Sequence, residues 1–341
     1  MNWLEQEAKA QSTRRVAVAS IVVAITLLIL GAQWRYFSNL FSGPYAISTA
    51  ELAKASNAEA LPRYYVRLAA DEVIDLGMEE VTVRKKRGVE RSRSVSAHYY
   101  VAKMGERLLI VKSKDAPGTE LRGELRDIPG DVHKGIFSSA RAKAAEPRFY
   151  PMMLDTGDFS GGGMIALGVA ALVILGALWY GGLALTRVLD PHKHPVLKKL
   201  GASGNLDVLA TNLQTEINSA AKLKFGDHTF TPRFVVRRAM LQFDVHELDK
   251  LIWAYKQVTQ NKIYGIIPTS KTFGASINFV KDSIAVTGKE PAIDSLLDGL
   301  SRTAPWAAYG FSDDLKKTFE KQRPELAAWA EERRRRPPQA T

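Results

Sequence analysis

Few residues of this chain have the spacing that a catalytic or metal site requires. Residues Gly157 to Gly162 resemble the loop around a nucleophilic serine, but Phe159 interrupts the pattern and an apolar run follows at once. His192 and His194 are two positions apart, and no further ligand lies near them in the sequence. Thr287 to Glu290 lacks the glycine spacing and the hydroxyl residue of a phosphate-binding loop. These segments are therefore expected to be a lead-in to the apolar run, a basic linker and a hairpin turn.

The composition narrows the chemistry further. The 341 residues include no cysteine, which excludes disulfides, thiolate metal sites and cysteine nucleophiles. The sequence contains no zinc-protease helix motif, dinucleotide fingerprint or kinase motif set. We therefore expect a protein that is not an enzyme and that has no catalytic, cofactor-binding or metal-binding residues. The enzymatic alternative is a hydrolase with an unrecognised site, which requires a histidine or carboxylate pair to converge in a pocket.

Two clusters of basic residues could bind anions, and the net charge of the chain is +11. The first is Arg84, Lys85, Lys86 and Arg87, which could contact a polyanion or anionic lipid headgroups; a solvated hairpin tip is the alternative. The second is Arg333, Arg334, Arg335 and Arg336, which could contact anionic lipid; a frayed, solvated tail is the alternative. Nucleic acid is not an expected partner, because the basic residues are dispersed along the chain and lack a reading motif.

Aromatic residues in the last third of the chain could form a ligand box. The pattern favours a core role for them, because they recur within segments that resemble packed strands and turns: Trp253, Tyr255, Trp306 and Tyr309.

Two uncharged apolar runs are long enough to cross a membrane. The first extends from Val16 to Ala32 and continues to Trp34, and the second extends from Met164 to Leu185. A cleaved signal peptide is the alternative for the first run, but Leu30-Gly31-Ala32 places a bulky residue where a small one is preferred. A buried core helix is the alternative for the second. We predict transmembrane helices over residues 16–34 and 162–187.

The spans themselves carry no Asp, Glu, Lys, Arg or His, so transport by this chain alone is not expected. Small residues four positions apart, such as Ala166 and Ala170 or Ala177 and Gly181, allow close approach of another helix. That helix could be the first span or a second copy of the chain, which would make a homo-oligomer through the second span.

Charge next to the spans predicts the topology. Arg14 and Arg15 precede the first span, and Arg187 and Lys193 follow the second. By the positive-inside rule, both termini are expected in the cytoplasm and residues 35–160 on the other side. The basic residues within that long segment do not alter this, because long segments translocate largely regardless of charge.

Short strands and turns alternate in both soluble segments. Tyr64 to Leu68, Arg107 to Lys112 and Glu120 to Leu125 are strand candidates before the second span, and they favour a small β-barrel-like (OB-like) domain. Residues 47–60 show a helical pattern, and residues 131–146 show one over part of their length. After the second span, strand candidates from Phe230 onwards precede a helix over Pro291 to Leu300, while residues 247–258 fit a short helix or a strand.

The sequence thus predicts an α+β membrane protein in seven segments. These are residues 1–15, the cytoplasmic N-terminus; 16–34, the first transmembrane helix; 35–160, the extracytoplasmic β-rich domain; 162–187, the second transmembrane helix; 188–225, a juxtamembrane linker and helix; 226–311, a cytoplasmic α+β domain; and 312–341, a C-terminal helix and basic tail.

The two spans, the β-rich segment between them and two aromatic stretches carry a resemblance. Asp249 to Tyr255 and Ala304 to Gly310 look like parts of a family of uncharacterised bacterial two-pass membrane proteins, and the cytoplasmic part is similar to bacterial pleckstrin-homology-like (PH-like) domains. The resemblance implies a multi-pass protein of the bacterial inner membrane with a PH-like domain. It implies no catalytic residues.

We expect a non-enzymatic membrane-anchored interaction or scaffold protein whose soluble domains bind protein or lipid partners on both sides of the bilayer. An accessory subunit of a larger complex for transport or envelope assembly is the alternative. The expected partners are the lipid bilayer and a protein that the sequence does not identify.

Overall fold

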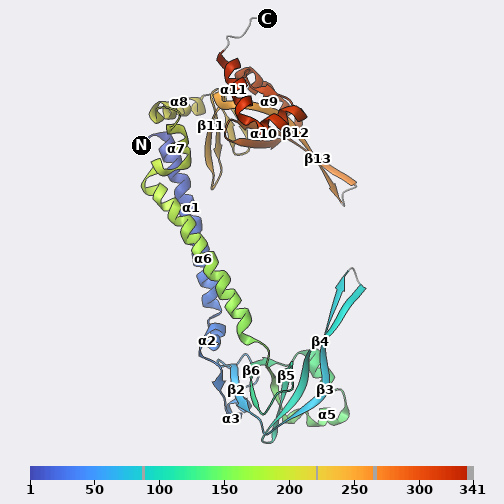
Figure 1. Ribbon diagram of the computed structural model, residues 1–341. Helices are drawn as coiled ribbons and strands as arrows, with labels where there is room; N and C mark the ends of the chain where they lie inside the picture. Colours follow the sequence, from blue (N-terminus) through green and yellow to red (C-terminus); the bar gives the residue numbers. More distant parts are fainter. Residues whose placement is uncertain (87–88, 220–221, 264–266, 336–341) are drawn as a thin grey trace. The chain divides into compact units, whose positions relative to one another are not determined.

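The chain has a mixed α+β fold with two long apolar helices (Figure 1). The computed structural model describes residues 1–86, 89–219, 222–263 and 267–335. The chain divides into two compact units. We call Met1–Ser20 together with Leu178–Thr341 the terminal unit, and Ile21–Ala177 the central unit.

The long helices are α1 (Trp3–Ala32) and α6 (Phe159–Leu189), of 30 and 31 residues. At 1.5 Å per residue each is about 45 Å long, more than the ~30 Å hydrocarbon core of a bilayer. Only 6% of the most apolar window of either helix is buried. Leu28 and Leu172 are each 72% exposed. Both helices are therefore long and apolar enough to cross a membrane, and neither resembles the covered core helix of a soluble protein.

The central unit contains one seven-stranded sheet, in the order β1-β2-β6-β7-β5-β4-β3. Its strands are β1 (Tyr45–Ala46), β2 (Tyr65–Ala69), β3 (Glu72–Lys86), β4 (Val89–Met104), β5 (Arg107–Ser113), β6 (Glu120–Asp127) and β7 (Phe149–Asp155).

This sheet is open, so the predicted barrel-like (OB-like) closure is wrong. The edge strands β1 and β3 do not pair with each other, and β5 and β7 run parallel. A parallel pair needs a crossover connection, which here contains β6, α4 (Gly130–Ile136) and α5 (Ala140–Ala145). Strand β3 pairs with β4 alone along its whole length, and the two continue beyond the sheet as a long hairpin.

Both faces of the sheet are covered at its centre. Leu109, Ile110 and Val111 are adjacent in β5 and fully buried, although side chains in a strand alternate between faces. Leu109 and Val111 pack on the side of α3 (Thr49–Lys54), and Ile110 packs with Phe137 near α4. The predicted helices are confirmed over 131–146 as α4 and α5, whereas only Thr49–Lys54 of residues 47–60 is an α-helix.

Aromatic contacts fix the start of α6 to the sheet. Phe159, which interrupts the serine-loop pattern, is buried and stacks on Tyr65 at 4.3 Å between ring centroids. The hydroxyl of Tyr36, in α2 (Trp34–Ser42), donates a 2.7 Å hydrogen bond to the Phe159 carbonyl. Asn39 of α2 is also buried and accepts from the backbone amides of Tyr64 and Tyr65. The lead-in to the second apolar run is thus a packed junction.

The terminal unit contains two antiparallel meanders, each in a four-stranded sheet, with α9 packed against both. The first sheet contains β8 (Leu223–Phe225), β9 (His228–Phe230), β10 (Phe234–Arg238) and β11 (Phe243–Glu247). The second contains β12 (Leu251–Ile263), β13 (Ile267–Phe279), β14 (Ser283–Gly288) and the short β15 (Ala308–Tyr309), which pairs parallel to β12. The helices are α7 (Pro195–Gly201), α8 (Leu206–Asn218), α9 (Glu290–Thr303), α10 (Asp313–Lys321) and α11 (Arg323–Arg335).

The expected order of strands followed by a helix is therefore found. Ile293, Leu296 and Leu300 of α9 lie on one face at helical spacing and are buried against residues of both sheets. Residues 251–258 belong to strand β12, which decides between the helix and the strand expected there. Neither sheet closes into a barrel.

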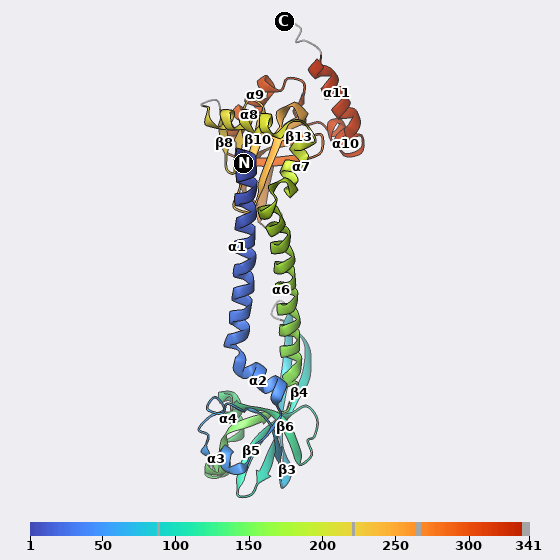
Figure 2. The ribbon, with the colours of Figure 1, turned by 90° about the vertical axis from the view of Figure 1, so that its left-hand side faces the viewer.

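The first turns of α1 belong to the terminal unit (Figure 2). Leu4 and Ala8 are fully buried in one cluster with Leu197 of α7 and Val245 of β11. The buried Gln11 side chain bonds to the carbonyl of Leu241 and to His194. Residues 1–15, predicted as a separate N-terminal segment, are thus the first half of α1 and part of a hydrophobic core.

We predict that Leu4→Ala lowers the stability of the terminal unit by about 3 kcal/mol, because it opens a cavity among fully buried side chains. The thermal midpoint of the full chain in detergent should fall by roughly 6–12 °C. Lys9→Ala, at an exposed position of the same helix, should leave it nearly unchanged. Equal midpoints for the two variants would contradict the docking of α1.

Candidate functional site

A cavity of about 490 Å³ in the terminal unit is lined by α7, the end of β11 and the β13–β14 turn. Its walls combine apolar groups such as Phe279 with the charged or titratable side chains of Lys199, His246, Lys250 and Asp282. A histidine and two carboxylates, His246, Asp244 and Asp282, meet here, which is the kind of convergence that the hydrolase alternative requires.

His246 is 3% exposed and stacks on Phe279 at 4.8 Å between centroids. Its Nδ1 lies 3.3 Å from the Lys199 ammonium, which also donates a 2.5 Å hydrogen bond to Asp282. Its Nε2 lies 3.3 Å from an Asp244 carboxylate oxygen, although the alignment is too poor for a hydrogen bond. Burial opposes ionisation of Asp244, but the contacts with His246 and Lys199 outweigh it and lower the pKa of that carboxyl group.

This arrangement gives His246 a structural role. A general base needs a nitrogen that faces the hydroxyl it deprotonates, and both ring nitrogens of His246 face charged groups of the network. The cavity wall also contains a hydroxyl group, that of Ser203. It accepts a 2.5 Å hydrogen bond from the Lys250 ammonium. Lys250 is also ion-paired with Glu247. The network joins α7, β11 and the β13–β14 turn.

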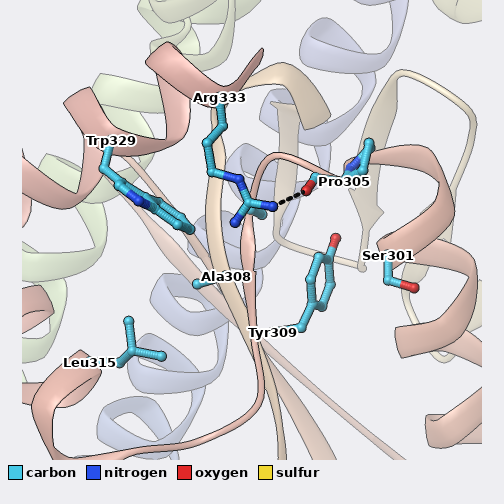
Figure 3. Close-up of a pocket in the computed structure, with 8 residues that line it drawn as sticks. Ser301, Pro305, Ala308, Tyr309, Leu315, Trp329 and Arg333 are labelled. Atoms are coloured by element: carbon cyan, nitrogen blue, oxygen red, sulfur yellow. Dashed lines mark hydrogen bonds between the residues drawn. The ribbon is translucent and has the colours of Figure 1, made fainter. Parts of the chain in front are cut away.

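A second pocket, of about 520 Å³, lies where α9, α10 and α11 meet the β15 segment (Figure 3). Arg333 of α11 projects over it and donates a 3.2 Å hydrogen bond to the Pro305 carbonyl. Its guanidinium also lies 4.6 Å from the ring centre of Trp329, whose side chain is 39% exposed. Tyr309 lines the opposite wall, and its hydroxyl donates to the Leu300 carbonyl at 2.7 Å.

The three described arginines of the second basic cluster differ in their contacts. Arg334 pairs with Asp249 and Glu331, and Arg335 pairs with Glu331. Within residues 323–335, where α11 is described, Arg333 has no carboxylate partner, and its remaining N–H groups are available to a ligand. Arg336 lies outside the described residues. The helix itself is packed rather than frayed up to Arg335, because Leu326 and Ala330 are buried against β12.

The first basic cluster lies at the far end of the β3–β4 hairpin. Arg84 is exposed, Lys85 and Lys86 pair through their backbones with Glu90 and Val89, and Arg87 lies outside the described residues. The two clusters belong to different units. They do not form one site within either unit.

The two histidines after α6 have protein partners. His192 lies 3.4 Å from Glu5, and His194 is buried, bonded to Gln11 and capping α7 through its Nδ1. Among the described residues, no group of three His, Asp or Glu side chains is placed to hold a metal ion. These histidines join α1 to the segment after α6.

The four aromatic residues considered as a ligand box are largely structural. Trp253 is 2% exposed and donates from its indole to the Gly310 carbonyl, and Tyr255 stacks on it at 4.4 Å. Trp306 packs against the α9 core. In the pocket of Figure 3, the aromatic residue with an exposed face is Trp329. The sequence does not single it out, although its i, i+4 spacing to Arg333 is an available signal.

The small residues of α6 serve packing at one position at least. A Cβ on Gly181 would lie 2.9 Å from the Cβ of Ala19 in α1, within the terminal unit, whereas one on Gly168 or Gly176 would meet nothing within 4 Å. Contact with the first apolar helix thus accounts for Gly181.

Comparison with known proteins gives no relative: no family model, no curated protein and no solved structure matches the chain. The candidate sites therefore rest on the geometry alone.

We predict that protonation of His194 destabilises the terminal unit. Burial, with Arg187 and Arg15 nearby, lowers the pKa of His194 from 6.5 to about 4. Since the folded-state pKa is depressed, the neutral histidine contributes stability that is complete above about pH 6.5 and is lost as the pH falls toward 4. The thermal midpoint should therefore decrease over this range.

His194→Asn retains an acceptor at the first residue before α7 and removes the titration. Its midpoint should fall less than that of the wild type between pH 7 and pH 4.5. Parallel pH profiles of the two proteins would contradict a buried neutral His194.

Proposed function

We propose that the chain is a non-enzymatic, membrane-anchored interaction or scaffold protein with soluble units on both sides of the bilayer. The observation that carries the proposal is the exposure of α1 and α6, since only 6% of each apolar window is buried. Apolar side chains without a protein cover are stable where lipid tails surround them.

An uncleaved first span is favoured by the packing of its N-terminal half. Removal of a signal peptide would take Leu4 and Ala8 out of a core in which both are fully buried. The same docking supports placing both termini in one compartment, because Met1–Ser20 and Leu178–Thr341 form one unit. The positive-inside rule favours the cytoplasm as that compartment. The resemblance to bacterial two-pass membrane proteins favours the bacterial inner membrane.

The two meanders followed by α9 support a PH-like assignment for the cytoplasmic unit, and with it the resemblance to bacterial two-pass membrane proteins. PH-like modules are binding platforms, and the pocket of Figure 3 is the partner site we favour in this unit. Trp329 offers an apolar face, and Arg333 offers N–H donors that no described carboxylate engages, so a partner with an apolar group next to a carboxylate would suit both.

A labelling experiment tests the topology. Lys103→Cys and Lys281→Cys place single thiols at exposed positions of the central and terminal units of a cysteine-free chain. In intact cells, an impermeant thiol reagent should label Lys103→Cys only, and Lys281→Cys should react after permeabilisation. Labelling of both positions from the same side would contradict the proposal.

A second experiment tests the partner site. Crosslinking in native membranes followed by mass spectrometry should identify a partner whose yield falls about fivefold or more in Arg333→Gln and Trp329→Ala, as for residues at the centre of an interface. Arg335→Gln is the matched control, because Arg335 is paired with Glu331. Equal loss in all three variants would contradict a specific role of the pocket. A stoichiometric polytopic partner would favour the accessory-subunit alternative.

A further inference from the structure

The β3–β4 hairpin extends beyond the sheet of the central unit. The pairing of β4 with β5 extends from Met104, opposite Arg107, to His98, opposite Ser113. Beyond this point, seven residue pairs continue between β3 and β4, from Glu80–Ala97 to Lys86–Val89. We call residues 80–86 and 89–97 the arm; at about 3.3 Å per residue it is roughly 20 Å long.

The arm leaves the sheet at the edge from which α6 leaves. Lys112 at the end of β5 pairs with Asp155, the last residue of β7, and α6 begins at Phe159. Since His98 is opposite Ser113, the residues His98, Ser113 and Asp155 lie along one edge of the sheet. Figures 1 and 2 both show the arm and the first part of α6 on this side of the central unit.

The position of the bilayer along α6 follows from exposure. Phe159 is packed in the core of the central unit, while Ile165 is 70% exposed. Six residues of helix rise about 9 Å, so the lipid-facing surface begins within roughly 10 Å of the sheet edge. An arm about twice that length, leaving the same edge, reaches the headgroup layer.

The composition of the arm suits that layer. Residues 80–86 and 89–97 include five basic side chains and two acidic ones, a net charge of +3. In the described part of the arm, Arg84 and Arg91 have no carboxylate partner, and Arg93 is 3.9 Å from Glu90, with both side chains at least half exposed. Such an exposed pair is worth little, so these positive charges remain available.

One face of the arm also carries aliphatic side chains. Val81 is paired with Val95 and Val83 with Arg93, and paired residues share a face of the ribbon. Val81 and Val95 are 38% and 46% exposed. Valines beside arginines match the boundary between acyl chains and headgroups, where charged groups stay hydrated. A register shift between Glu80 and Val81 lies at the base of the arm, and such bulges bend a ribbon.

On the basis of the proposed membrane insertion, we propose that the β3–β4 arm binds the anionic headgroups of the leaflet next to the central unit. The charged tip is excluded from the hydrocarbon by its solvation cost, so the arm lies along the headgroups. It thereby adds a lipid contact to the two helices.

The test uses the full chain in vesicles of neutral phosphatidylcholine, with or without 30% phosphatidylglycerol. A fluorophore on Ser94→Cys measures contact of the arm with lipid. A fluorophore on Glu106→Cys, in the β4–β5 turn at the opposite edge of the sheet, serves as the reference for a position in water. Quenching by brominated lipid at Ser94→Cys should be at least twice as strong with the anionic lipid as without it. It should remain low at Glu106→Cys.

The variant Arg84→Gln/Arg91→Gln/Arg93→Gln should reduce quenching at Ser94→Cys to the level of neutral vesicles. Lys134→Gln/Arg141→Gln/Lys143→Gln removes equal charge from exposed positions of α4 and α5 and should have no effect. Quenching at Ser94→Cys that equals the value at Glu106→Cys, or that does not depend on anionic lipid, overturns the proposal. The thiol labelling of Lys103→Cys and Lys281→Cys from opposite sides then shows whether only the arm, or membrane insertion itself, has failed.

Discussion

Apolar side chains that protein does not cover need another apolar environment, and in this chain they are concentrated along α1 and α6. Exposing them to water would cost about 25 cal/mol for every Å² of apolar surface. The start of each helix is packed into the core of one unit. Leu4 and Ala8 anchor the start of α1 in the terminal unit, and Phe159 anchors the start of α6 in the central unit.

The positions of the ionisable groups along the chain follow from the same constraint. The apolar runs 16–34 and 164–185 contain no charged residue, so the charges lie in the soluble units, where several form local ion pairs. Lys199, Asp244, His246 and Asp282 join three elements, and Arg334 and Arg335 are neutralised on their own helix. Among the described residues, Arg333 in the terminal unit and the arm arginines Arg84 and Arg91 in the central unit have no carboxylate partner, and they lie in the proposed contact surfaces.

The sequence was sufficient for features that depend on local pattern. The apolar runs, strands β5 and β6 and the α9 face agree with the periodicities of their residues. The length of β3 and β4 could not be predicted, because the arm is solvated on most of its surface and its residues beyond Val83 are mostly charged or polar. The open sheet was missed because its parallel β5–β7 pair joins strands far apart in the chain, and β7 was not recognised.

The sites were less predictable than the fold. A run of four arginines does not reveal that Arg334 and Arg335 share Glu331 while Arg333 extends over Trp329, because this depends on how α11 packs on β12. Burial of Leu4 and Ala8 was also hidden, since their partners in α7 and β11 follow them by about 190 and about 240 residues. Around His246, by contrast, ionisable groups converge as they would in a site, but their contacts are with one another and join α7, β11 and the β13–β14 turn.

The central claim is that lipid tails surround the exposed face of α6, and a spin label at Leu172→Cys tests it directly. Leu172 is 72% exposed and lies far from either end of the helix. In reconstituted vesicles, collisions with molecular oxygen, which concentrates in the hydrocarbon, should greatly exceed collisions with a water-soluble nickel chelate. A label that collides mainly with the nickel chelate would place this face of α6 in water and contradict the account.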